Sequence, residues 1–291
     1  MTPDEYTHWD AIAFSWSDPY RGDRVNEVLG ARKKMTMEDM KALQTDYLSI
    51  PARTLVPMLT GIGFDGKAAV AKEKVMNWNY SLDPNSVPAA IYVAWENQLG
   101  IMSDERFIPE QAKTTVSGIQ MKRIIDWLME PDTKFGANPL LGRDQFLHDA
   151  FINAVGDLEK NLGSDITQWQ YGQEKNKHTY MEHALSNAVN TETKSKLDLG
   201  PLPRGGNSYT PGSTGGNLRQ SSGASFRMIV NTGDWDAAIG TNGPGQSGDP
   251  DSSFYDNLFE PWAKDQYFPV YYSRSKIESV AASTKILMPL K

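Results

Sequence analysis

The chain has 291 residues, of which 39% are hydrophobic and 10% aromatic, so a packed core is expected and global disorder is excluded. The formal net charge of −7, without any run of Lys or Arg, argues against a surface for nucleic acid or for an anionic membrane. Cysteine is absent, which excludes disulfides, thiolate metal sites and a Cys nucleophile. No apolar stretch approaches the roughly 20 residues of a membrane-spanning helix.

The first two thirds of the chain, from Asp23 to about Asn187, have the pattern of a mostly helical region. Thr36, followed by two acidic residues, is a typical N-cap in front of an amphipathic run. Apolar residues at helical spacing predict further helices over residues 52–62, 68–78, 87–99, 116–129 and 143–162.

The composition changes at Gly200. Residues 201–223 are rich in Gly, Ser, Pro and Asn, and they are either a linker between domains or a long ordered loop. We favour the loop, because the strands expected after it are too few to stand alone. The loop lacks the Gly-Lys-Ser/Thr of a phosphate-binding loop. We therefore expect one unit over residues 1–291, mostly helical over 1–199 and strand-rich over 200–291.

The last third alternates strands and turns. β-branched and aromatic residues predict a strand over 225–230, and a Gly-Asp turn leads to a return strand over 235–239. Ser252 is an N-cap candidate for a short helix that carries an apolar face as far as Trp262. Residues 268–272 are expected to form another strand.

Two further features are better explained by structure than by chemistry. His178 and His183 are five residues apart, a spacing that would splay them around a helix, unlike the i, i+4 pair of a zinc site. Thr2 would become an N-terminal nucleophile if Met1 were removed, but Pro3 follows it and no strand-like apolar run comes next. We interpret all three as ordinary residues.

Three segments near the end of the chain form a familiar combination. They are the Gly-x-Ser-x-Arg strand of residues 223–227, the Gly-Pro-Gly-Gln-Ser-Gly loop of residues 243–248, and the helix of residues 252–262. In this order and spacing they resemble the C-terminal end of penicillin acylase family β-chains. Phe254 departs from the family, whose members often have His there, and we expect this to change packing rather than the fold.

Three earlier segments extend the resemblance over nearly the whole chain, in the family's order. Residues 17–25 resemble the family's Arg-containing segment, and residues 44–49 (Gln-x-Asp-x-x-Ser) resemble the helix that follows it. Residues 169–172 (Trp-Gln-Tyr-Gly), with His178 after them, resemble a third segment of the family.

The resemblance implies an α+β fold: part of an αββα N-terminal nucleophile hydrolase sandwich with a large helical insert. In this family a Ser freed by self-cleavage begins the β-chain, and its own α-amine acts as the base. An Asn side chain and backbone N–H groups form the oxyanion hole. By the family's pattern, the Ser and the Asn both lie upstream of this sequence. The chain is thus expected to be the C-terminal portion of an acylase β-chain that lacks its nucleophile.

Two residues of this sequence match functional positions of the family. Arg24 matches an arginine beside the reaction centre that is thought to support the transition state, with Arg21 as a competing match. Asp10 matches one ligand of the Ca²⁺ ion that some members bind, although Ca²⁺ needs six to eight oxygens. The residues alone leave both open, because Arg24 could equally form an Arg–Asp pair that opens a helix and Asp10 could cap a turn.

The resemblance also implies partners and alternatives. The expected partners are an upstream α-chain, the N-terminal segment of the β-chain and a small-molecule amide, with no nucleic acid and no membrane. Family members are commonly exported to the periplasm or secreted, but the polar, acidic residues 1–10 are not expected to be a signal peptide. The alternatives are a truncated, non-catalytic remnant, or an acylase for acyl-homoserine lactones or cephalosporins.

Overall fold

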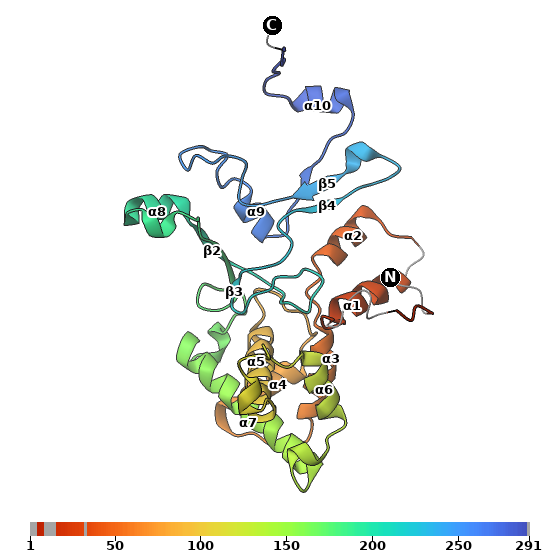
Figure 1. Cartoon of the computed structure of the whole chain (residues 1–291), viewed down its shortest axis with the longest axis vertical. Coiled ribbons are helices and arrows are strands. Elements are labelled where there is room, and N and C mark those ends of the chain that lie inside the picture. Colours follow the sequence, from red (N-terminus) through yellow and green to blue (C-terminus); the bar gives the residue numbers. More distant parts are fainter. Residues whose placement is uncertain (1–4, 9–15, 32–33, 290–291) are drawn as a thin grey trace.

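A computed structural model describes residues 5–8, 16–31 and 34–289 (Figure 1). Helices α3 to α7 gather in one body, the strands lie beyond one end of it, and the C-terminal segment projects away from both. The combination of a helical body with small sheets confirms the α+β class. Among the described residues, none of the helices is long and apolar enough to cross a bilayer.

Seven helices precede residue 170 in the described part of the chain. Their bounds are α1 (Tyr20–Gly30), α2 (Met37–Gln44), α3 (Ile50–Leu55), α4 (Gly66–Met76), α5 (Val87–Phe107), α6 (Met121–Met129) and α7 (Pro139–Leu162). The predicted helices are therefore confirmed, with shifted ends. The one expected over 52–62 starts within α3 and continues as the 3-10 helix η2 (Val56–Leu59).

Helices α5 and α7 form the centre of the helical body. Each begins with a side-chain cap and a proline: Ser86 caps α5 and Asn138 caps α7, each by accepting a backbone N–H of the first turn. Trp95 of α5 and Phe151 of α7 are fully buried, with ring centroids 5.7 Å apart. The Trp95 indole donates to the Leu147 carbonyl at 3.3 Å, so this large ring is buried without an orphaned donor.

Helix α2 begins where the sequence predicts. The Thr36 hydroxyl accepts the Asp39 N–H at 3.1 Å, and the Asp39 carboxylate accepts the Thr36 N–H at 3.0 Å. This reciprocal capping box satisfies two of the donors that a helix start leaves unpaired.

Residues 44–49 are not the single helix that we expected. Helix α2 ends at Gln44, and α3 starts after Ser49, whose hydroxyl accepts an N–H of its first turn. Asp46 lies between the two helices, where its Oδ1 accepts the Leu48 N–H at 2.7 Å. A short polar side chain that bonds the backbone two residues on competes with helix formation, which explains the break.

The described residues after α7 form two three-stranded sheets, the first of which begins at residue 178, inside the region that we expected to be mostly helical. The strands are β1 (His178–Met181), β2 (Leu199–Pro203), β3 (Arg219–Gln220), β4 (Arg227–Ile229), β5 (Ile239–Thr241) and β6 (Phe268–Pro269). The first sheet has the order β2-β1-β3, with β1 antiparallel to β2 and parallel to β3. The second is antiparallel and has the order β4-β5-β6, so β4 is an edge strand. The remaining helices are α8 (Thr191–Leu197), α9 (Phe259–Ala263) and α10 (Arg274–Val280).

Several elements of the last third are shorter than expected. Residues 235–237 form a 3-10 turn rather than a strand, because the Asp234 carboxylate accepts the Asp236 N–H at 3.1 Å. The strand expected over 268–272 ends after two residues. Beyond it, the Asp236 carboxylate accepts two backbone N–H groups, each at 2.8 Å. The helix expected from residue 252 is confined to α9, and turns precede it. The region is therefore richer in loops than in strands.

The Gly-rich stretch 205–223 is an ordered loop held by the buried Lys177. The Lys177 ammonium donates to three carbonyls of the loop, those of residues 214, 216 and 217, at 2.6, 2.9 and 2.9 Å. Burial, together with the nearby charge of Arg204, lowers the pKa of this ammonium to about 8. The loop also packs on the Tyr47 ring at Gly205, where a Cβ would lie 2.6 Å from a ring carbon.

Candidate functional site

Arg24 lies on α1 and reaches across to the break between α2 and α3. Its Nε and Nη2 atoms contact the Asp46 Oδ2 atom at 2.8 and 2.7 Å, and its Nη1 atom lies 3.2 Å from a Glu27 oxygen. The Arg24 side chain is 17% exposed, so the pair is partly shielded from water. Asp46 is itself fixed by the Leu48 N–H, and the guanidinium is therefore held in one orientation.

The ion pair continues from Arg24 to α3. Glu27 receives two hydrogen bonds from Arg53 Nη1, at 3.0 and 2.9 Å, as well as its contact with Arg24. The bond from Arg53 is the largest cause that holds the pKa of Glu27 below its usual range. Two arginines and two carboxylates thus form a balanced chain that ties α1, the Asp46 turn and α3 together.

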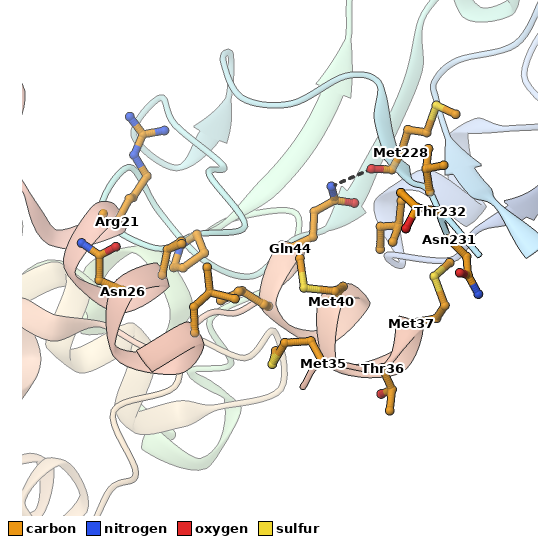
Figure 2. A pocket seen from close by; sticks show the side chains of 17 residues that line it. Arg21, Asn26, Met35, Thr36, Met37, Met40, Gln44, Met228, Asn231 and Thr232 are labelled. Carbon is orange, nitrogen blue, oxygen red and sulfur yellow. Dashed lines mark hydrogen bonds between the residues drawn. The ribbon is translucent and has the colours of Figure 1, made fainter. Parts of the chain in front are cut away.

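Arg21 lies one helical turn before Arg24 and has a different setting. It is exposed, and its Nη1 atom donates to the Ser213 hydroxyl at 3.0 Å. It also stands at the rim of a groove of about 950 Å³ (Figure 2). The two candidate arginines therefore occupy different places: Arg24 lies within an ion-pair network, and Arg21 borders an open surface.

The groove lies between α1, α2 and β4, and we refer to it as the α1–α2–β4 groove. The apolar side chains that line it include Leu29, Met35, Met40, Leu43, Met228 and Val230. Figure 2 shows the methionines of the α2 segment on one side and the residues of β4 facing them across the groove. Gln44 bridges the two sides, because its Nε2 atom donates to the Met228 carbonyl at 3.4 Å.

A buried charge cluster centres on Asp265, a residue that the sequence did not single out. The arginine of the Gly-x-Ser-x-Arg segment, Arg227, binds Asp265, and Arg204 donates to the same carboxylate oxygen at 2.9 Å. The Tyr47 hydroxyl donates to the other oxygen, and burial raises the pKa of this tyrosine. Both arginines are 2% exposed, so the cluster is shielded from water. Because Arg227 of β4 and Tyr47 of the helical part both contact Asp265, the cluster joins the β4 sheet to the helical part.

The sequence analysis also did not identify Glu96, an acidic residue that is buried. It lies on α5, 3% exposed, and its two oxygens accept hydrogen bonds from the Tyr92 hydroxyl at 2.6 Å and the Asn207 amide at 2.9 Å. Burial raises the pKa of Glu96 to about 7, while these two hydrogen bonds act in the opposite direction. A charged residue within an otherwise apolar helical run was the available signal.

The residues of the Trp-Gln-Tyr-Gly segment have structural roles. Trp169 donates to the Gly163 carbonyl at 2.8 Å, Tyr171 donates to the Gly206 carbonyl at 2.8 Å, and both rings are buried. His178 lies on strand β1, within the region up to about residue 187 that we expected to be mostly helical.

Asp10 and Thr2 lie outside the described residues. Within the described ranges, no group of three or more His, Cys, Asp or Glu side chains is placed to hold a metal ion.

Comparison with known proteins identifies the family. The sequence profile of the family described as penicillin amidase matches residues 1–279. The chain is 24% identical to the acyl-homoserine lactone acylase QuiP of Pseudomonas aeruginosa, over 95% of this chain and 37% of that protein. It is also 24% identical to the penicillin acylase 2 proenzyme of Pseudomonas sp. strain SE83, over 97% of this chain and 37% of that protein.

A solved structure supports the same relationship at the level of the fold. The thermostable penicillin G acylase of Alcaligenes faecalis superposes with a TM-score of 0.59 at 14% identity, over 99% of this chain and 55% of that one. Of the two curated relatives described above, the chain spans little more than a third of the length. Because the family profile covers nearly all of its residues, this chain belongs to the penicillin amidase family.

Proposed function

We propose that the chain is the C-terminal portion of the β-chain of an amide-cleaving acylase, which works together with a segment that carries the nucleophile. The observation that carries this proposal is the family match over residues 1–279, in a chain that spans 37% of two relatives named as acylases. The partners would be an upstream α-chain and the N-terminal segment of the β-chain. One of the relatives is named as a proenzyme, which agrees with an enzyme that is cut into chains.

The proposed reaction is acyl transfer through an N-terminal Ser of the upstream segment. The Ser oxygen attacks the amide carbon, the α-amine of the same Ser takes its proton, and that proton passes to the leaving amine. Water then hydrolyses the acyl-enzyme. Arg24 contributes a fixed positive charge near the oxyanion, which stabilises the transition state more than the bound substrate. Its contacts with Asp46 and Glu27 keep the guanidinium plane in place.

Activity measurements test this proposal directly. The chain alone should hydrolyse no amide, whereas the chain together with the segment encoded upstream of residue 1 should release phenylacetyl or long-chain acyl groups with saturable kinetics. Turnover by the isolated chain would contradict the proposal. A correctly assembled pair without turnover would favour a non-catalytic remnant.

The identity of the acyl group is a second question. The two relatives are named for different substrates, acyl-homoserine lactones and penicillins, so both classes are candidates here. We favour an N-acyl small molecule of either class, because the chemistry at the amide is the same. A panel of N-acyl homoserine lactones, penicillins and cephalosporins, compared by kcat/KM on the assembled enzyme, distinguishes them.

Calcium and export complete the proposal. Asp10 would supply one Ca²⁺ ligand only if oxygens from outside the described residues supply the others. In the assembled enzyme, Asp10→Ala should then weaken calcium affinity and leave the fold intact. Unchanged affinity would return Asp10 to a capping role.

We propose a periplasmic or secreted location, which fractionation of cells with an antibody to the chain can test.

A further inference from the structure

The outer face of strand β4 is apolar although it faces solvent. Arg227 and Ile229 of the strand are buried, whereas the residues that alternate with them, one within β4 and one on either side of it, are exposed. These exposed residues are Phe226, Met228 and Val230, which are 54%, 41% and 41% exposed. A contiguous exposed apolar surface of this kind usually marks an interface. Met228 and Val230 of this face also line the α1–α2–β4 groove.

The opposite wall of the groove has matching chemistry. Met35, Met37 and Met40, together with Met228 on β4, give the groove four flexible, polarisable side chains that adapt to an irregular partner. Among the described residues that line the groove, Arg21 is the single charged side chain. The lining therefore favours an apolar partner with an acidic group near the α1 end.

The groove exists before anything occupies it. Gln44 donates to the Met228 carbonyl at 3.4 Å, and the Tyr267 hydroxyl donates to Gln44 Oε1 at 2.7 Å. This relay fixes the distance between α2 and the edge strand. Because the side chain of Gln44 already occupies a carbonyl on the β4 edge, the partner is expected to pack on side chains rather than to extend the sheet.

We propose that the α1–α2–β4 groove seats an apolar segment of the upstream part of the same acylase, with an acidic residue of that segment beside Arg21. The proposal rests on the proposed function, because that function supplies the upstream partner. The relatives' length supports it: the chain spans 37% of two curated acylases and 55% of a solved one, so each of these relatives has further residues that could cover this face. Arg21 gives charge complementarity at one end.

Binding of the upstream segment tests the groove without any substrate. The tagged segment encoded upstream of residue 1 is titrated with this chain, and the dissociation constant is measured for the native chain, Met228→Asp and Val230→Asp. Each carboxylate would be buried without a partner on assembly, so we expect binding to weaken at least about 100-fold. Both positions are partly exposed in the chain alone, so the substitutions should be tolerated before assembly.

Two further variants sharpen the test. Leu141→Asp on α7 is the matched control, because Leu141 is 65% exposed and lies outside the groove, and its binding should equal that of the native chain. Arg21→Glu should weaken binding by about tenfold, and the loss should shrink at high salt.

The outcomes separate this proposal from the proposed function. Native-like binding by both groove variants would overturn the proposal. So would self-association of the chain that Met228→Asp abolishes while the upstream segment still binds, since the occupant would then be a second copy. If the groove variants fail to bind and the native assembled pair cleaves no amide, the interface stands and the acylase function fails.

Discussion

Arg24 sits between two carboxylates, so its charge is balanced within the fold before any substrate arrives. An isolated surface ion pair stabilises a protein by about 0–1 kcal/mol, but here the guanidinium is only 17% exposed and contacts both Asp46 and Glu27. Such an arginine can hold a helix in place. It can also present the donors that these carboxylates do not use, since a guanidinium has about five.

Kinetics of the assembled enzyme distinguish these two roles. If Arg24 supports the transition state, Arg24→Ala should lower kcat by about 100-fold, the size of effect seen when one oxyanion donor is removed. KM should change much less. Arg24→Lys should rescue only part of the loss, because an ammonium cannot reproduce the planar fork that Asp46 holds.

Arg21→Ala is the control for that measurement. Because Arg21 is exposed and its guanidinium donates a hydrogen bond to the Ser213 hydroxyl, away from the Arg24 ion pairs, kcat per assembled enzyme should change little. A large loss of kcat in Arg21→Ala with a near-neutral Arg24→Ala would reverse the assignment of the two arginines. If both variants are neutral and stay folded, the Arg24 ion pair is purely structural.

Glu96 gives a pH-dependent contribution to stability whose sign follows from its burial. Its pKa is raised from 4.5 to about 7, so the folded protein holds this proton more tightly than the unfolded chain does. Below pH 4.5 the acid is neutral in both states and its contribution is fully present; that contribution is lost as the pH rises through 7. The loss is about 3 kcal/mol at pH 8.

Replacement of Glu96 by Gln should remove this pH dependence. Chemical denaturation of the assembled protein at several pH values between 5 and 8 measures it. The free energy of unfolding of the native protein should fall over this range relative to that of Glu96→Gln. Any fixed offset from the new amide facing Asn207 is the same at every pH. Parallel curves for the two proteins would show that Glu96 keeps its ordinary pKa.

At the scale of elements, the sequence predicted helices better than strands, and the contacts explain the difference. The start of α2 depends on Thr36 and Asp39, three residues apart, so its signal is local. The second sheet instead pairs β5 with β6 across almost thirty residues, and short-range bonds of Asp234 and Asp236 compete with pairing. The periodicity of apolar residues in the sequence does not show whether such short-range bonds or strand pairing will prevail.

The same reasoning applies to the candidate site. Arg24 was identified through its resemblance to a family segment, but its partner Asp46 is 22 residues away and was read as part of a helix. The cluster around Asp265 joins it to Tyr47, 218 residues earlier in the chain. Such pairs arise only when the tertiary fold brings distant segments together, so composition and spacing could not reveal them.

At the scale of the whole molecule, apolar burial is unevenly distributed. The main core cluster lies in the helical part, between Tyr20 and Tyr171, and includes fully buried Trp95 and Leu99. The cluster of the last third contains three buried residues, Phe259, Trp262 and Ala263. Helix α10 buries none of its side chains, and it projects from the body together with the segment that follows it (Figure 1). The two ends of the molecule therefore bury apolar side chains to very different degrees.

This asymmetry predicts how the isolated chain behaves. Without the upstream part, Phe226, Met228 and Val230 stay exposed, so the chain should aggregate or remain a loosely packed monomer. Hydrogen exchange should protect the amides of α5 and α7, whose centre is fully buried, far more than those of residues 225–289. Addition of the upstream segment should raise protection over β4 first. A monodisperse monomer with one sharp melting transition and uniform protection would instead show that the chain is an independent domain.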